Sequence, residues 1–386
     1  MIQRLHPTLS TGGNTTSMKF GAFFLSQAPE DRLTPAQALS EELGQMELAE
    51  ELGFDSVWLA EHRQTSYCVV SDALTYASYV AARTSRIRIG LAVSVLPLRN
   101  PLEFAERATL IDILSNGRLN VGVGRGYSRT EFDTYDQPLE DRRARFEEAL
   151  DVITRAWTER NFDHEGQFWT FRNVNIYPRP VQQPHPPLYV ASSGSPDTVF
   201  SVARRGLPIL QGDDLLSPRK AGERFGIYRE QAGAAGRPES DSNAAIADSW
   251  VAQKVFLAPT TAAAREFATP YLEWRQRKMM DLQPPGAAPT LTTKLRAKVP
   301  GLKSVLSASH QKPENEITAD DMLQFGIFGT PDDCIERLRE FERAGAQNIL
   351  CSFTYGGMPG DKVRETMRLF AAEVMPAFQR QEVHHG

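Results

Sequence analysis

Three ionisable side chains stand side by side at positions 61–63, where Glu61, His62 and Arg63 follow the apolar run SVWLA at 56–60. Such a group could bind an anion or move a proton, because an imidazole titrates close to neutral pH. The competing interpretation is a loop that becomes polar because it meets water, with His62 hydrogen-bonded by Glu61. The position of the group directly after an apolar run does not decide between the two interpretations, and the functional one gains support only from the ends of other predicted strands.

A second candidate feature is Arg125 in the stretch NVGVGRGYS, where Gly124 and Gly126 flank it. Glycine lets a backbone approach a ligand closely, and a guanidinium can donate two hydrogen bonds to a phosphate. The glycine spacing differs from the Gly-x-Gly-x-x-Gly pattern of dinucleotide-binding folds, so we expect no nicotinamide site here. The alternative is a glycine-rich turn with a surface arginine.

A third feature is the turn VASSGSPDT, in which Ser192, Ser193, Gly194 and Ser195 lead into a predicted helix at 195–206. Hydroxyls and free N–H groups at the start of a helix bind anions. Ordinary capping of the helix by Ser195 explains the same residues. Because Arg125 and this turn follow neighbouring predicted strands, one phosphate could contact both.

A fourth feature is the strand GLAVSVLP, in which a flat ring could lie against Ala92, Val93 and Ser94.

The elements that must position all these residues alternate along the chain between strands and helices. Strands are predicted at 18–25, 56–60, 86–97, 118–124, 187–191, 207–211, 250–258 and 348–353. Helices are predicted at 34–54, 71–84 with Ser71 as N-cap, 100–117, 142–157, 195–206, and from Thr330, where Asp333 completes a capping box.

The strands are continuous apolar runs, which is typical of parallel sheets covered on both faces. The expected fold class is therefore α/β, a (β/α)8 TIM barrel whose active site lies at the C-terminal ends of its strands. An open, doubly wound sheet is the alternative. We expect a flexible leader at 1–17, one domain at 18–380 and a polar tail at 381–386. Two insertions are expected, a small hairpin near 160–180 and a longer, lid-like segment near 280–325.

The composition narrows the class of function. The 386 residues are 41% hydrophobic and carry a net charge of −5, so neither nucleic acid nor an anionic membrane surface is an expected partner. No apolar run is long enough to span a bilayer. The three cysteines lie far apart and in no metal-binding spacing, which fits reduced thiols in a cytoplasmic protein without a metal.

Together these stretches resemble the bacterial luciferase-like superfamily of flavin-dependent oxidoreductases. The resemblance covers 18–212, including ELGFDSVWLAEHR and ILSNGRLNVGVGRGY, and returns at 326–378 with FGTPDDCIERLREFERAGAQNIL. It implies a TIM barrel that uses reduced FMN as a co-substrate. It further implies an O2-dependent monooxygenase that oxygenates a small organic substrate through a flavin 4a-hydroperoxide, with reduced flavin supplied by a separate NAD(P)H:flavin reductase.

The resemblance also assigns roles to particular residues. It implies that His62 and its acidic neighbour Glu61 are catalytic. The cofactor-binding residues would be Ala92, Val93, Ser94, Arg125, Gly126, Tyr127, Ser192, Ser193, Gly194 and Ser195. Arg125 and the serines would hold the phosphate, the Ala92–Val93 pair would back the flavin ring at the position of a non-prolyl cis bond in luciferase, and Glu131 would lie beside the flavin.

Two positions depart from the pattern. Arg63 replaces the second histidine of many relatives, which puts substrate contacts in doubt. Gly124 replaces the reactive cysteine of luciferase, which argues against light emission.

Two other functions remain open, a deazaflavin-dependent oxidoreductase that transfers hydride on the same fold and a non-catalytic flavin-binding protein. A homodimer is expected in each case.

Overall fold

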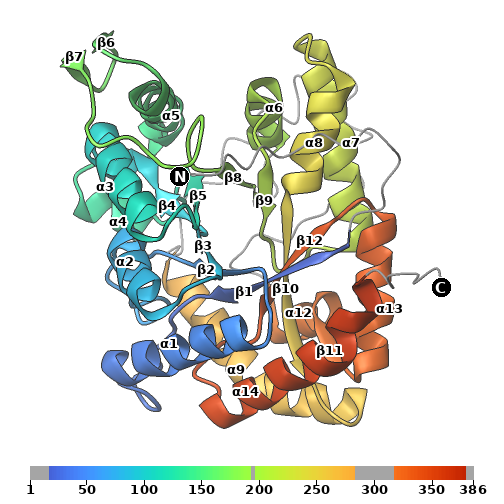
Figure 1. Ribbon diagram of the computed structural model, residues 1–386. Coiled ribbons are helices and arrows are strands. Elements are labelled where there is room, and N and C mark those ends of the chain that lie inside the picture. The colour runs from blue at the N-terminus through green and yellow to red at the C-terminus, as the bar shows by residue number, and fades with distance from the viewer. Residues whose placement is uncertain (1–16, 193–195, 283–316, 380–386) are drawn as a thin grey trace, which may run out of the picture.

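Eight parallel strands close into a barrel surrounded by helices (Figure 1). The computed structural model describes residues 17–192, 196–282 and 317–379. The barrel strands are β1 (Lys19–Phe24), β2 (Ser56–Leu59), β3 (Arg88–Leu91), β5 (Leu119–Gly124), β8 (Leu188–Ser192), β9 (Ile209–Gln211), β10 (Trp250–Leu257) and β12 (Asn348–Ser352). Because β10 pairs with both β9 and β12, and β12 with β1, the circuit of eight strands closes, and the predicted (β/α)8 barrel is confirmed.

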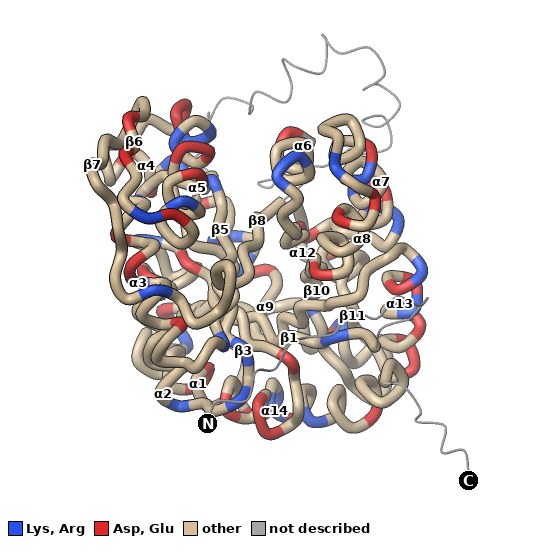
Figure 2. The backbone as a smooth tube through the Cα atoms, turned by 45° about the horizontal axis from the view of Figure 1, so that its top comes forward, with Lys and Arg blue, Asp and Glu red and all other residues tan. Residues whose placement is uncertain are grey.

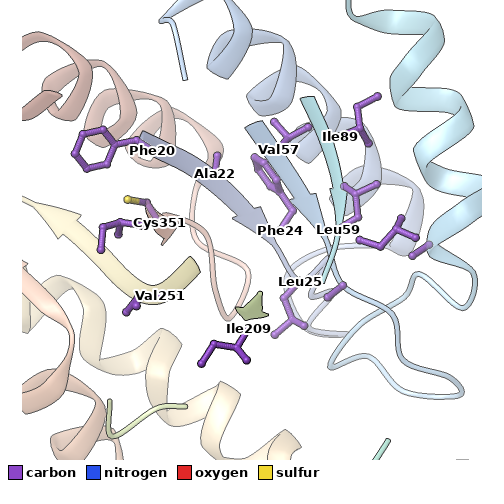
Figure 3. Close-up of a cluster of buried hydrophobic side chains, with 14 of the residues drawn as sticks. Phe20, Ala22, Phe24, Leu25, Val57, Leu59, Ile89, Ile209, Val251 and Cys351 are labelled. Atoms are coloured by element: carbon purple, nitrogen blue, oxygen red, sulfur yellow. The ribbon is translucent and has the colours of Figure 1, made fainter. Parts of the chain in front are cut away.

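Side chains alternate between the two faces of the strands, as the pleat requires. One face packs against the helices, and Figure 3 shows members of this outer cluster from β1, β2, β3, β9, β10 and β12. The other face fills the barrel with large rings and aliphatic side chains, namely Trp58, Tyr189, Leu210, Trp250 and Leu350, with Phe23, Ala92, Val93 and Ala252 packed against them. The barrel interior is therefore a solid apolar floor beneath the C-terminal mouth.

The helices that cover the barrel are α1 (Pro35–Glu51), α2 (Ala73–Arg83), α3 (Pro101–Leu114), α5 (Arg142–Thr158), α6 (Pro196–Arg205), α7 (Pro218–Ala234), α8 (Glu239–Asp248), α9 (Thr261–Asp281), α13 (Pro331–Arg343) and α14 (Gly360–Leu369). The capping box of α13 is confirmed, since Thr330 and Asp333 cap each other. The N-cap of α2 is Asp72, whose carboxylate accepts from Leu74 N, so the predicted cap Ser71 is wrong by one residue.

The predicted strand at 86–97 is two strands, β3 and the short β4 (Ser94–Val95). They are separated by a cis peptide bond between Ala92 and Val93. After this break β4 pairs with the end of β5, so the chain is redirected at the barrel mouth.

The predicted hairpin insertion is confirmed as β6 (Phe162–Glu165) and β7 (Thr170–Val174), which pair antiparallel beside α5 (Figure 1). Glu148 of α5 fixes it by accepting hydrogen bonds from the backbone of its turn, at Gln167, Phe168 and Trp169.

The longer insertion is bordered by helix on both sides. α9 runs to Asp281, and a short helix α12 (Ala319–Phe325) leads into β11 (Ile327–Gly329), which pairs with β10 outside the barrel circuit. The centre of that segment, like the leader and the tail, lies outside the described residues, so the lid and the leader stay predictions.

Charged residues of both signs are interspersed along the outer helices (Figure 2). In the described part of the chain no helix is long and apolar enough to cross a membrane. Cys68, Cys334 and Cys351 are buried free thiols.

Candidate active site

His62 lies just beyond β2 at the barrel mouth, and its partner is Glu131 at 2.8 Å from Nδ1. Glu131 belongs to the short helix α4 (Arg129–Thr134) and is 2% exposed. A carboxylate oxygen accepts hydrogen bonds, so this contact favours the tautomer that has its proton on Nδ1. This leaves Nε2 directed toward the hydroxyl of Tyr127, at 3.4 Å. The expectation that Glu61 satisfies His62 is wrong.

Glu61 serves a different purpose, because both of its carboxylate oxygens are occupied by protein groups. It accepts from Arg63 at 2.7 Å, from Arg99 at 2.5 Å and from the backbone N–H of Ala73 at 3.0 Å. Its side chain has no exposed surface. These contacts make Glu61 a residue that ties β2 to α2 and to the loop after β4, and its expected catalytic role stays a prediction.

Arg63, the departure from the related sequences, is also part of this framework. Its guanidinium donates to Glu61 and lies 3.9 Å from the second oxygen of Glu131. Its backbone N–H donates to Glu131 as well, at 3.1 Å. Since the side chain is 5% exposed, Arg63 bridges two buried carboxylates and holds Glu131 in line with His62.

Ala92 and Val93 form a small partly exposed surface at the mouth, as predicted for the wall behind a flat ring. Ser94 does not share this surface. It is fully buried, and its hydroxyl donates to Glu61 at 3.2 Å. The side chain of Ser94 is therefore turned toward Glu61, and its expected place among the cofactor-binding residues stays a prediction.

Arg125 reaches the first turn of α6, where it donates to the hydroxyl of Thr198. Thr198 is 4% exposed, and sequence reasoning missed it although it lies three residues beyond the serine turn. Among the described residues no carboxylate lies within ion-pair distance of Arg125. Burial lowers the pKa of Arg125, and the nearby positive charges of Arg142 and Arg143 lower it further. The guanidinium cluster would be relieved by an anion.

Ser192 ends β8 next to this cluster. It is 1% exposed, and its Oγ has no hydrogen-bond partner in the described part of the chain. A buried hydroxyl without a partner is uncommon, because its desolvation is then uncompensated. Ser193, Gly194 and Ser195 lie outside the described residues, so their expected contacts stay predictions.

The glycines around Arg125 are required by the close approach of neighbouring groups. A Cβ on Gly124 would lie 2.6 Å from Val93 Cγ2, and Gly126 has a positive φ of 72° with Phe132 and Val95 crowding the same space. Gly124 thus allows the wall residue Val93 to lie flat against β5.

Known proteins resemble this chain over most of its length. The family model described as luciferase-like monooxygenase matches residues 18–348. The alkanal monooxygenase alpha chain of Photorhabdus luminescens is 24% identical over 95% of this chain and 98% of its own length. The oxygenase component of the flavin-dependent trigonelline monooxygenase of Acinetobacter baylyi is 25% identical over 95% of this chain and 97% of its own length.

Solved structures share the fold. The monooxygenase RslO1 from Streptomyces bottropensis superposes with a TM-score of 0.76 at 26% identity, covering 94% of this chain and all of its own. An F420-dependent secondary alcohol dehydrogenase superposes with a TM-score of 0.69 at 19% identity, covering 95% of this chain and all of its own.

Proposed function

Because the chain belongs to the luciferase-like monooxygenase family, we propose that it is an FMN-dependent monooxygenase that uses O2 to oxygenate a small organic substrate. In this proposal a separate reductase supplies the reduced flavin. The observation that carries the proposal is Arg125, a partly buried cation at the barrel mouth whose described partner is the hydroxyl of Thr198.

The residues present fit FMN. A phosphate placed between Arg125, Thr198 and the start of α6 would give Arg125 the directly bonded anion that it lacks among the described residues, and it would offer acceptors to Ser192 Oγ. The ring would then extend toward the partly exposed surface of Ala92 and Val93, where Val93 packs into the space that Gly124 leaves without a Cβ. These features lie on β3, β5 and β8, which are consecutive around the barrel.

Bound reduced flavin supplies the electrons that activate O2, and the protein supplies orientation, proton control and dry surroundings. We assign proton control to His62, whose imidazole is fixed by Glu131 and keeps Nε2 directed at the mouth. Glu61 and Arg63 act as positioning residues, because they hold the loop that carries His62.

In this proposal the apolar floor of the barrel keeps water away from the lower side of the site. The rings of Trp58, Tyr189 and Trp250 pack against one another there, and none of the three is more than 7% exposed. A floor of this kind strengthens the hydrogen bonds formed above it, because the local dielectric constant is low.

A second candidate is a deazaflavin-dependent oxidoreductase that transfers hydride without O2. The similarity to the F420-dependent secondary alcohol dehydrogenase favours it, since that protein has the same fold. FMN and F420 both carry a ring and a phosphate, so the phosphate site proposed at Arg125, Thr198 and Ser192 suits either cofactor.

The test is a comparison of cofactors under labelled oxygen. The protein is mixed with reduced FMN and 18O2, or with reduced F420 without O2, and presented with a panel of aldehydes, ketones and aromatic compounds. The proposal expects 18O in a product with FMN and no conversion with F420. Turnover with F420 alone would establish the second candidate, and no turnover with either cofactor despite FMN binding would indicate a flavin-binding protein.

A further inference from the structure

A second buried cationic group lies at the barrel mouth and has no part in the proposed handling of flavin. Asp214, in the loop after β9, forms ion pairs with both Lys254 of β10 and Arg275 of α9. The three side chains are only 10–12% exposed. With two cations and one carboxylate, the trio carries an excess positive charge in a place where charge is costly.

The strand register explains why these residues meet. Val251 of β10 is level with Gln211 of β9, so Lys254 and Asp214 each follow three residues later on adjoining paths. Trp250 and Ala252 contact the residues that fill the barrel, and alternation along the strand directs Lys254 to the same inner face. The lysine therefore rises from the barrel wall at the mouth.

The place of β10 in the barrel sets what Lys254 can face. The strand order around the barrel runs β3, β5, β8, β9, β10, so β10 lies four strands from β3 in a circuit of eight. Lys254 is thus on the wall opposite Ala92 and Val93, the proposed backing of the flavin ring. A substrate that lies over the exposed side of that ring would lie between the ring and Lys254.

The trio also connects to the proposed proton-handling residues. Arg275 donates to the hydroxyl of Tyr67 at 2.9 Å, and the ring of Tyr67 lies 5.4 Å from that of His62 in an edge-to-face arrangement. Arg275 interacts electrostatically with Tyr127 on the other side of His62 as well. Only the side chain of Tyr67 therefore separates the positive charge of Arg275 from the imidazole of His62.

Lys254 is the member of the trio with spare donors. Its ammonium has three N–H groups, and in the described residues it is hydrogen-bonded to Asp214. Burial, together with the charge of Arg275, lowers the pKa of Lys254 to about 8, so it is mainly protonated at neutral pH. Arg275, by contrast, is held by Asp214, Tyr67 and the sulfur atoms of Met279 and Met322.

We propose that Lys254 binds an oxyanion of the substrate, most simply a carboxylate, and so directs the carbon to be oxygenated toward the flavin ring and His62. This inference rests on the proposed function, because that function places the ring against β3. A carboxylate of the substrate would balance the charge of this trio, with two anions for two cations. A purely structural ion pair would need only Asp214 and Arg275, and the additional buried lysine would then weaken it.

The test measures binding and does not depend on turnover. Acetate, hexanoate and benzoate are each compared with their neutral amides by calorimetric titration, with saturating FMN present so that its phosphate, rather than the carboxylate under test, occupies the site at Arg125. Wild type is expected to prefer at least one carboxylate over its amide by about tenfold or more. In Lys254→Met this preference is lost, while the affinity for the amide is unchanged.

The matched control is Lys278→Met, which removes a lysine from the more exposed part of α9, where it pairs with Glu30 and Asp281. It is expected to keep the carboxylate preference. Lys254→Gln is a second variant in case Lys254→Met unfolds, with folding checked by thermal melting. The preference of wild type for a carboxylate over its amide can be measured even if both variants unfold.

The proposal is overturned if wild type shows no carboxylate preference in the presence of FMN, or if Lys254→Met or Lys254→Gln retains it. FMN titration of the same samples separates the two claims. If wild type does not bind FMN, the proposed function is wrong. If wild type binds FMN but shows no Lys254-dependent preference for a carboxylate over its amide, only the substrate class is wrong.

Discussion

His62 and His164 form a natural comparison at the scale of single residues. Both pair with a glutamate, at 2.8 Å and 3.1 Å, and both side chains are 12–13% exposed. Only His62 faces the barrel mouth, whereas His164 lies in the β6–β7 hairpin. The two histidines are therefore alike in pairing and exposure but differ in location, so only His62 is expected to affect turnover.

We expect His62→Ala to lower turnover about 10²–10⁴-fold, the usual contribution of a general acid or base. Binding of FMN and the melting temperature should stay near wild type. His164→Ala is the control and should leave turnover unchanged. If the two variants lose activity equally, or only in step with their stability, His62 is a structural residue.

Glu61 is expected to act on stability. Glu61→Gln would leave Arg63 and Arg99 facing a neutral amide in a buried site, which typically costs about 3–5 kcal/mol of unfolding free energy. Urea unfolding measures this loss. A variant with wild-type stability but no turnover would instead support the catalytic role that the sequence resemblance implies.

At the scale of elements, the approach of β3 to β5 depends on glycine. A Cβ at Gly122 would lie 1.9 Å from the carbonyl oxygen of Leu91, a backbone atom that cannot rotate away. Gly122→Ala should therefore destabilise the barrel by about 1–3 kcal/mol or more. Gly44 of α1 has no neighbour within 4 Å, so Gly44→Ala should stabilise by up to about 1 kcal/mol. Similar melting temperatures for the two variants would contradict this account.

Helix α1 carries a pH-dependent element, the buried Glu42. Burial raises the pKa of Glu42 to about 7 from an ordinary 4.5, although Ser26 hydrogen-bonds to it. The folded chain therefore holds this proton more tightly than the unfolded chain does. The resulting stabilisation is complete below pH 4.5 and is lost as the pH rises to about 7.

Glu42→Gln should accordingly match wild type near pH 4 and exceed it above pH 7. The pKa difference of about 2.5 sets an upper limit of about 3 kcal/mol on the gain. Chemical denaturation at several pH values measures it. A constant difference between variant and wild type across this range would show that Glu42 does not titrate as described.

For the molecule as a whole, the barrel could be predicted because its signals are local. Each strand is a short apolar run, and each intervening helix has its own period and caps. The split of β3 from β4 was harder to predict from composition, since GLAVSVLP reads as one continuous strand. Only the resemblance to luciferase indicated a cis bond between Ala92 and Val93.

The site could be predicted less completely than the fold. The residues at strand ends were found because the barrel brings those ends together, but the partners of those residues come from distant segments. Glu131 is 69 positions from His62, and Thr198 is 73 positions from Arg125. Adjacency in the sequence suggested Glu61 for His62, whereas the folded chain turns Glu61 toward the arginines.

The central claim is that Arg125 binds the phosphate of a flavin at the barrel mouth, and one titration tests it most directly. FMN and riboflavin, which differ by the phosphate, are titrated into wild type and Arg125→Ala, with the more exposed Arg129→Ala as control. We expect wild type to bind FMN more tightly than riboflavin. Arg125→Ala should lose about 1.5–3 kcal/mol of FMN binding and nothing of riboflavin binding, the range for a hydrogen bond to a charged group. Equal affinity of wild type for the two flavins, or undiminished FMN binding by Arg125→Ala, would contradict the account.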